Sequence, residues 1–147
     1  MRTSPVIPQF RDDGFLPEGV HLATEAEVTF RFGTSNPHRR RLTLRLRHWL
    51  ELARLTRSQR FLLDGSFVTA KERPGDIDAV VLLAEDFEQQ LALELVPAVE
   101  LEEMLRWHRP EEIFAAEDSR DWRDWVKFFS RTREPDSRRK GLVEIQL

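Results

Sequence analysis

Hydrophobic residues recur at helical spacing between residue 37 and about residue 55 of the chain. The residues on this stripe are Leu42, Leu46, Trp49, Leu50 and Ala53. Asn36 and Pro37 precede the stripe, a polar cap followed by a proline at the first helical position, where the missing amide hydrogen costs nothing. The pattern therefore predicts a helix with one buried face. The opposite face carries Arg39, Arg40, Arg41, Arg45 and Arg47. We expect these arginines to be solvated, with a phosphate-facing patch as the alternative.

Shorter patterns predict the other elements. Thr24 and Glu27 form a capping-box pattern that starts a helix of about two turns. Apolar runs and alternation predict strands at 60–63, 77–83, 112–116 and 141–147. Helical spacing predicts two helices within 84–107, broken at Pro97, and another at 121–131. The last of these is expected to bury Trp122, Trp125, Val126 and Phe129. In this order the elements predict an α/β (α+β) fold, a small mixed sheet flanked by helices.

Length and composition limit the kind of protein this is. The chain has 147 residues, 40% hydrophobic and 33% charged, and a net charge of -3. These values are typical of one globular domain, and they exclude binding to a polyanion by net charge alone. We expect residues 24–147 to form a single domain and residues 1–23, which contain three prolines, to be an irregular arm.

The chain contains no cysteine, which excludes a disulfide framework, a thiolate zinc site and a cysteine nucleophile. It has neither a secretory signal pattern nor a run of about 18 apolar residues. We therefore expect a cytoplasmic protein that does not contact membranes.

The stretch from residue 63 to residue 83 carries the candidate chemistry. A predicted strand runs into Gly65 and Ser66, and nine residues later Asp76-Ile77-Asp78 opens a second strand. Glycine allows a sharp turn and a close approach of the backbone to a ligand, and a helical turn that starts at Ser66 would offer free amides to a phosphate. Side chains alternate along a strand, so Asp76 and Asp78 should face the same way with Ile77 in the core. Two adjacent carboxylates are suited to divalent metal ions.

This arrangement resembles the signature of the nucleotidyltransferase superfamily, a strand-borne Gly-Ser followed by a spaced Asp-x-Asp. Residues 16–24, 64–78 and 140–147 are also similar to a family of small prokaryotic nucleotidyltransferase-like proteins. The resemblance implies a transferase that moves a nucleoside monophosphate from a nucleoside triphosphate to a hydroxyl of an RNA or protein acceptor. It assigns nucleotide binding to Gly65 and Ser66, and catalysis and binding of Mg²⁺ or Mn²⁺ to Asp76 and Asp78. It also suggests a toxin–antitoxin or defence context with an antitoxin-like partner.

The superfamily uses a third carboxylate on a later strand. We expect Glu112 to supply it as a catalytic residue and metal ligand, because Glu112 and the apolar pair after it resemble the third-strand segment of relatives. Glu144 is the second choice, although its alternating strand favours a solvated position. Lys71, in the loop between the two halves of the motif, is expected to steer phosphates, with a solvated loop charge as the alternative. Asp64 departs from the pattern, since the superfamily usually has an apolar residue before the glycine.

Two other function classes remain open at this point. The first is a catalytically inactive nucleotide-binding or protein-interaction domain that lost its third carboxylate. The second is a structural RNA-binding subunit, based on the arginine face and a second basic cluster at residues 138–140. The four histidines have no metal-ligand spacing, and Ser66 lacks the Gly-x-Ser-x-Gly context of a serine hydrolase.

Overall fold

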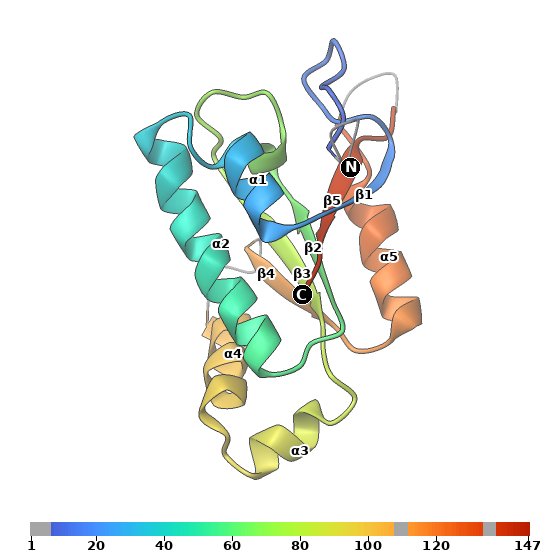
Figure 1. Cartoon of the computed structure of the whole chain (residues 1–147). Helices are drawn as coiled ribbons and strands as arrows, with labels where there is room; N and C mark the ends of the chain where they lie inside the picture. The colour runs from blue at the N-terminus through green and yellow to red at the C-terminus, as the bar shows by residue number, and fades with distance from the viewer. Residues whose placement is uncertain (1–6, 108–111, 134–137) are drawn as a thin grey trace, which may run out of the picture.

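A mixed five-stranded sheet forms the centre of the molecule (Figure 1). The computed structural model describes residues 7–107, 112–133 and 138–147. The strands are β1 (Gly19–Ala23), β2 (Arg60–Asp64), β3 (Asp78–Leu82), β4 (Ile113–Ala116) and β5 (Gly141–Ile145). Their order in the sheet is β1-β5-β2-β3-β4. β1 is parallel to β5 and β3 is parallel to β4, whereas β2 is antiparallel to both of its neighbours. The predicted α/β (α+β) architecture with a mixed sheet is confirmed.

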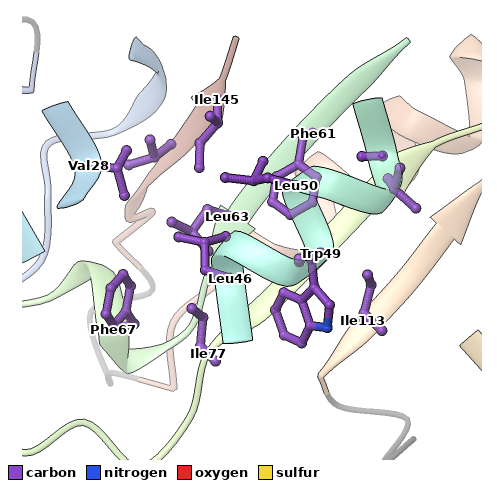
Figure 2. Close-up of a cluster of buried hydrophobic side chains, with 14 of the residues drawn as sticks. Val28, Leu46, Trp49, Leu50, Phe61, Leu63, Phe67, Ile77, Ile113 and Ile145 are labelled. Atoms are coloured by element: carbon purple, nitrogen blue, oxygen red, sulfur yellow. The ribbon is translucent and has the colours of Figure 1, made fainter. Parts of the chain in front are cut away.

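Helices cover both faces of this sheet. They are α1 (Glu25–Phe32), α2 (Pro37–Leu55), α3 (Phe87–Ala92), α4 (Val96–Trp107) and α5 (Ser119–Phe129). One core cluster joins α1, α2 and α4 to the sheet, and Figure 2 shows Leu46 and Trp49 of α2 packed among strand residues in it. A smaller cluster joins α5 to the other face through Trp122 and Phe129. Both faces of the central strands are therefore buried, which explains their nearly continuous apolar sequence.

The helix starts follow the capping signals of the sequence. The Thr24 hydroxyl accepts a hydrogen bond from the amide of Glu27, and the Glu27 carboxylate accepts one from the amide of Thr24, at 3.1 Å each. Asn36 caps α2 by accepting from the amide of Arg39 at 2.8 Å. The predicted helices at these two positions are confirmed.

Three expectations about local structure were wrong. Residues 19–23, placed in the irregular arm, form strand β1. The break between α3 and α4 lies at residues 93–95, where Glu94 adopts a positive φ of 55°. Pro97 instead sits in the first turn of α4, where proline is tolerated. Arg39 is not on the solvated face of α2, because only 5% of its surface is exposed. Within the described residues, no helix is long and apolar enough to cross a membrane.

Candidate functional site

The Gly-Ser turn and the two aspartates of the motif meet at one end of the sheet. β2 ends at Asp64 and β3 begins at Asp78, and these two residues lie opposite one another in the antiparallel pair. The connection between them starts with Gly65 and a short 3-10 turn, Ser66–Val68. Figure 1 shows this connection at the same end of the sheet as the N-terminal segment before β1.

Gly65 holds the turn close to the aspartate segment. Its φ is +90°, and a Cβ atom here would lie 3.0 Å from the amide nitrogen of Asp78 and 3.1 Å from Cα of Ile77. Any other residue would be strained in this conformation and would push the two segments apart. The close backbone approach predicted at Gly65 is therefore an approach to the segment 76–78 of the same chain.

Ser66 fixes the position of Asp76. Its amide donates to Oδ1 of Asp76 at 2.8 Å, and its hydroxyl donates to the same oxygen at 2.5 Å. The amides of Phe67 and Val68 donate to the carbonyl oxygens of Asp76 and Gly65. The expectation that this turn offers free amides to a phosphate is therefore wrong, and phosphate binding here would depend on side chains.

The carboxyls of Asp76 and Asp78 share a hydrogen bond and titrate in opposite directions. Burial raises the pKa of Asp78 to about 8, and the charge of Asp76 adds to this effect. Burial acts the same way on Asp76, but hydrogen bonds from Ser66 and from Asp78 outweigh it and lower its pKa. Burial and the neighbouring charge of Asp76 therefore favour the protonated form of Asp78. Ile77 between them is buried in the core of the opposite face (Figure 2), as the alternation predicted.

Asp64 adds a third carboxyl to this corner of the sheet. It is 3% exposed, and the ammonium group of Lys140 lies 3.0 Å from its Oδ1 and 3.1 Å from its Oδ2. Burial raises the pKa of Asp64, and the charge of Lys140 opposes that rise. The residue that departs from the superfamily pattern is thus part of a buried ion pair beside Asp78.

These side chains line a cavity of about 900 Å³. That volume falls in the range of sites for small molecules and cofactors. Its basic side chains are Lys71, Arg131, Arg133 and Lys140, and its aromatic rings are Phe15, Phe128 and Phe129. Carboxyls, cations and rings around one cavity are a combination suited to a phosphorylated ligand with an apolar part.

Asp64, Asp76 and Asp78 bring carboxyl oxygens, the kind of ligand that a divalent cation such as Mg²⁺ takes, to this cavity. Oδ1 of Asp78 is buried and has no hydrogen-bond partner, and Oδ1 of Asp64 is buried 3.0 Å from the ammonium group of Lys140. In the described ranges 7–107, 112–133 and 138–147, no three or more His, Cys, Asp or Glu side chains are grouped so that they could hold a metal ion. Mg²⁺ commonly takes only one or two protein carboxylates and completes its shell with water and substrate phosphates. Asp76 and Asp78 fit a cation of that kind, held together with a phosphate.

The structure does not bring the two expected third carboxylates to the cavity. Glu112 precedes β4 and accepts a hydrogen bond at 2.9 Å from Arg45 of α2, and it is not among the residues that line the cavity. Glu144 lies on β5 and makes a two-pronged ion pair with Arg60 at 2.7 Å and 2.6 Å. Lys71, Gly65 and Ser66, in contrast, do line the cavity.

Comparison with known proteins places the chain in one family. The model of a family of unknown function, DUF6932, matches residues 8–146. The chain belongs to this family. No curated protein and no solved structure is significantly similar to it.

Membership of DUF6932 does not indicate which reaction or ligand the chain has, so the role of the site is inferred from its geometry. Sequence reasoning missed Lys140 and Phe128 as cavity residues, because Lys140 lies just before β5 and Phe128 lies on α5, both far along the chain from the motif. One feature of the sequence could have indicated that Asp64 belongs to a site. A charged residue at the end of an otherwise apolar strand has to find a partner, since an unpaired buried charge is very costly.

Proposed function

We propose that the chain is a metal-dependent nucleotidyltransferase that moves a nucleoside monophosphate from a nucleoside triphosphate to a hydroxyl of an RNA or protein acceptor. The observation that carries the proposal is the adjacency of Asp76 and Asp78 beside the Gly65-Ser66 turn. Both carboxyls open into a cavity that also contains basic side chains. The resemblance to the superfamily signature adds the reaction class.

In the proposed reaction Asp76 and Asp78 would hold Mg²⁺ or Mn²⁺ together with the phosphates. The cation would neutralise phosphate charge and make the acceptor hydroxyl more acidic. Ser66 orients Asp76 through its amide and hydroxyl. Lys71, Arg131 and Arg133 would offset the negative charge of the departing pyrophosphate. The acceptor oxygen forms a bond to the α-phosphorus while the bond from the α-phosphorus to the oxygen that bridges the α- and β-phosphates breaks, which releases pyrophosphate. The proton of the acceptor hydroxyl passes to a carboxylate of the cavity.

The aromatic side of the cavity is the proposed position of the nucleoside. Phe128 is 56% exposed although it is a large apolar residue. It makes edge contacts with Trp125 at 6.0 Å and with Phe129 at 5.3 Å. These contacts fix its orientation, so the ring is preorganised for stacking on a base.

The test is labelling with each α-³²P-labelled nucleoside triphosphate, Mg²⁺ or Mn²⁺, and cell extract. We expect label on RNA or protein with the native chain and at least a hundredfold less with Asp76→Asn/Asp78→Asn, because electrostatic stabilisation of the phosphates is lost. Glu85→Gln/Glu88→Gln is the matched control, since both residues are exposed and lie outside the cavity. Equal labelling by the native chain and the Asp76→Asn/Asp78→Asn variant would contradict the proposal.

A second candidate function is nucleotide binding without transfer. The position of Glu112 favours it, because this carboxylate pairs with Arg45 instead of entering the cavity. In that case, isothermal titration would show a magnesium–nucleotide complex binding to the native chain while no label is transferred. The antitoxin-like partner stays a prediction of the sequence resemblance.

A further inference from the structure

Lys140 is fixed at the edge of the acidic corner. Its amide donates to the carbonyl oxygen of Ser130 at 2.9 Å, and β5 begins at the next residue. Its ammonium group contacts both carboxylate oxygens of Asp64, and its side chain is 15% exposed. The ring of Phe15 lies 5.8 Å from Nζ on another side. The ammonium position is therefore set by several neighbours.

Stability alone does not explain a buried ion pair at this place. Desolvation of two charges commonly costs as much as their attraction returns, and a well-packed apolar pair is often as stable or more stable. The charge of Lys140 also acts on the two other carboxyls: it opposes the rise in the pKa of Asp78 and contributes to the lowered pKa of Asp76. Lys140 is thus a common counter-ion for all three carboxyls.

The same ammonium group faces the cavity. Lysine carries three donor hydrogens, and the two oxygens of Asp64 engage at most two of them in simple hydrogen bonds. Lys140 and the Asp64 carboxyl both line the wall that holds Asp76 and Asp78. A donor hydrogen therefore remains for an oxygen of a ligand bound at this wall.

We propose that Lys140, positioned by Asp64, is the resident cation of the site: it offsets the three carboxyls when the site is empty and donates to a phosphate oxygen when a triphosphate binds. This inference rests on the proposed function, because it takes the ligand to be a triphosphate with its divalent cation. Lys140 is then a ligand-binding residue, and Asp64 is a positioning residue that acts through it.

The proposal predicts changes of opposite sign for two probes. Lys140→Met removes the charge at similar length. Without the ammonium the corner is more negative, so Mn²⁺ alone should bind about threefold to tenfold more tightly. Inorganic tripolyphosphate with Mg²⁺ should bind about tenfold more weakly, which corresponds to about 1.4 kcal/mol. A substitution that only disturbs the structure would weaken the binding of both Mn²⁺ and tripolyphosphate.

Isothermal titration with the full chain measures both affinities. Lys127→Met is the matched control, because Lys127 is an exposed lysine of α5 outside the cavity, and it should change neither affinity. The Asp64→Asn/Lys140→Met variant removes both buried charges and guards against loss of folding. It should melt close to the native temperature and still bind tripolyphosphate about tenfold more weakly, about 1.4 kcal/mol.

The outcomes separate this inference from the function on which it rests. If the native chain binds neither Mn²⁺ nor tripolyphosphate, both proposals fall. If it binds both, and Lys140→Met shifts the two affinities in the same direction or leaves them unchanged, the role of Lys140 is overturned while the proposed function stands. Native tripolyphosphate affinity in Asp64→Asn/Lys140→Met would also overturn it.

Discussion

At the residue scale, the three carboxyls at the end of β2 and the start of β3 are arranged at a cost to stability. Asp64 and Asp78 are buried; the ammonium group of Lys140 is the side-chain partner of Asp64, and Oδ1 of Asp78 has no hydrogen-bond partner. A folded protein tolerates such groups mainly where they do chemistry or bind a ligand, because each one costs free energy in the empty state. The pKa of Asp78, about 8, makes this cost measurable.

Asp78→Asn should stabilise the protein without divalent cations, and more so at higher pH. Because the folded pKa of Asp78 is raised from 3.8 to about 8, the native state holds a proton that the unfolded chain releases between these values. Native stability therefore falls as pH rises from about 4 to about 8. The full shift would correspond to roughly 5–6 kcal/mol, and solvent screening near the cavity reduces it, so we expect a gain of about 1–2 kcal/mol at pH 8.

Denaturant melts of the native chain and Asp78→Asn with EDTA, at pH 4.5, 6, 7 and 8.5, check this prediction. Asp12→Asn controls for the loss of one formal charge at an exposed position. A stability difference that stays constant over this range would contradict the protonated state of Asp78.

At the element scale, the first turn of α2 holds the loop that joins the Gly-Ser turn to β3. The guanidinium of Arg39 donates to the carbonyl oxygens of Phe67 at 2.7 Å, Thr69 at 2.9 Å and Lys71 at 2.5 Å. Asn36 donates to the carbonyl oxygen of Glu72 at 2.8 Å. The loop therefore keeps one conformation although it lacks regular structure of its own beyond the 3-10 turn.

Arg39→Met should release this loop. The substitution keeps an apolar stem and removes donors to buried carbonyl oxygens, so we expect a loss of about 2–4 kcal/mol in the free energy of unfolding. Amide hydrogen exchange of residues 67–75 should accelerate more than that of β2 and β3. Arg40→Met is the control, because Arg40 is exposed on the same helix. Equal effects of the two substitutions would show that Arg39 has no special role.

The elements differ in how well the sequence predicts them. α2 and α1 were predicted because caps and apolar stripes are local signals, confirmed at Thr24 and Asn36. β1 was missed because three of its five residues are exposed and β5, its partner, follows more than a hundred residues later. Arg39 was misplaced because helical periodicity gives the direction of a side chain and cannot reveal the loop that covers it.

At the scale of the whole molecule, the candidate site is built from four separate parts of the chain. Its walls come from residues 13–15, 64–78, 128–133 and 140. The local motif predicted Asp76, Asp78 and the Gly-Ser turn, because those residues are close in sequence. The rest could not be predicted, since the approach of α5 and β5 depends on the order of strands in the sheet.

Phe128→Ala tests whether α5 contributes the nucleoside side of this assembled cavity. Loss of one stacking ring should weaken binding of a magnesium–nucleoside triphosphate complex about fivefold to tenfold, and binding of tripolyphosphate should not change, because tripolyphosphate has no base. Phe30→Ala is the control, since Phe30 is 84% exposed on α1 and outside the cavity. Competitive titration measures both ligands. If the substitution weakens the binding of both ligands to the same extent, Phe128 does not contact the base.

The position of β5 between β1 and β2 has a consequence for synthesis on the ribosome. β5 follows the other described helices and strands along the chain, yet it fits between β1 and β2. Until residues 140–145 emerge from the exit tunnel, β1 has no neighbouring strand and Asp64 has no ammonium group beside it. The nascent polypeptide therefore cannot form the Asp64–Lys140 ion pair before this stretch is translated, and a messenger truncated shortly before codon 140 would encode a product without that ion pair.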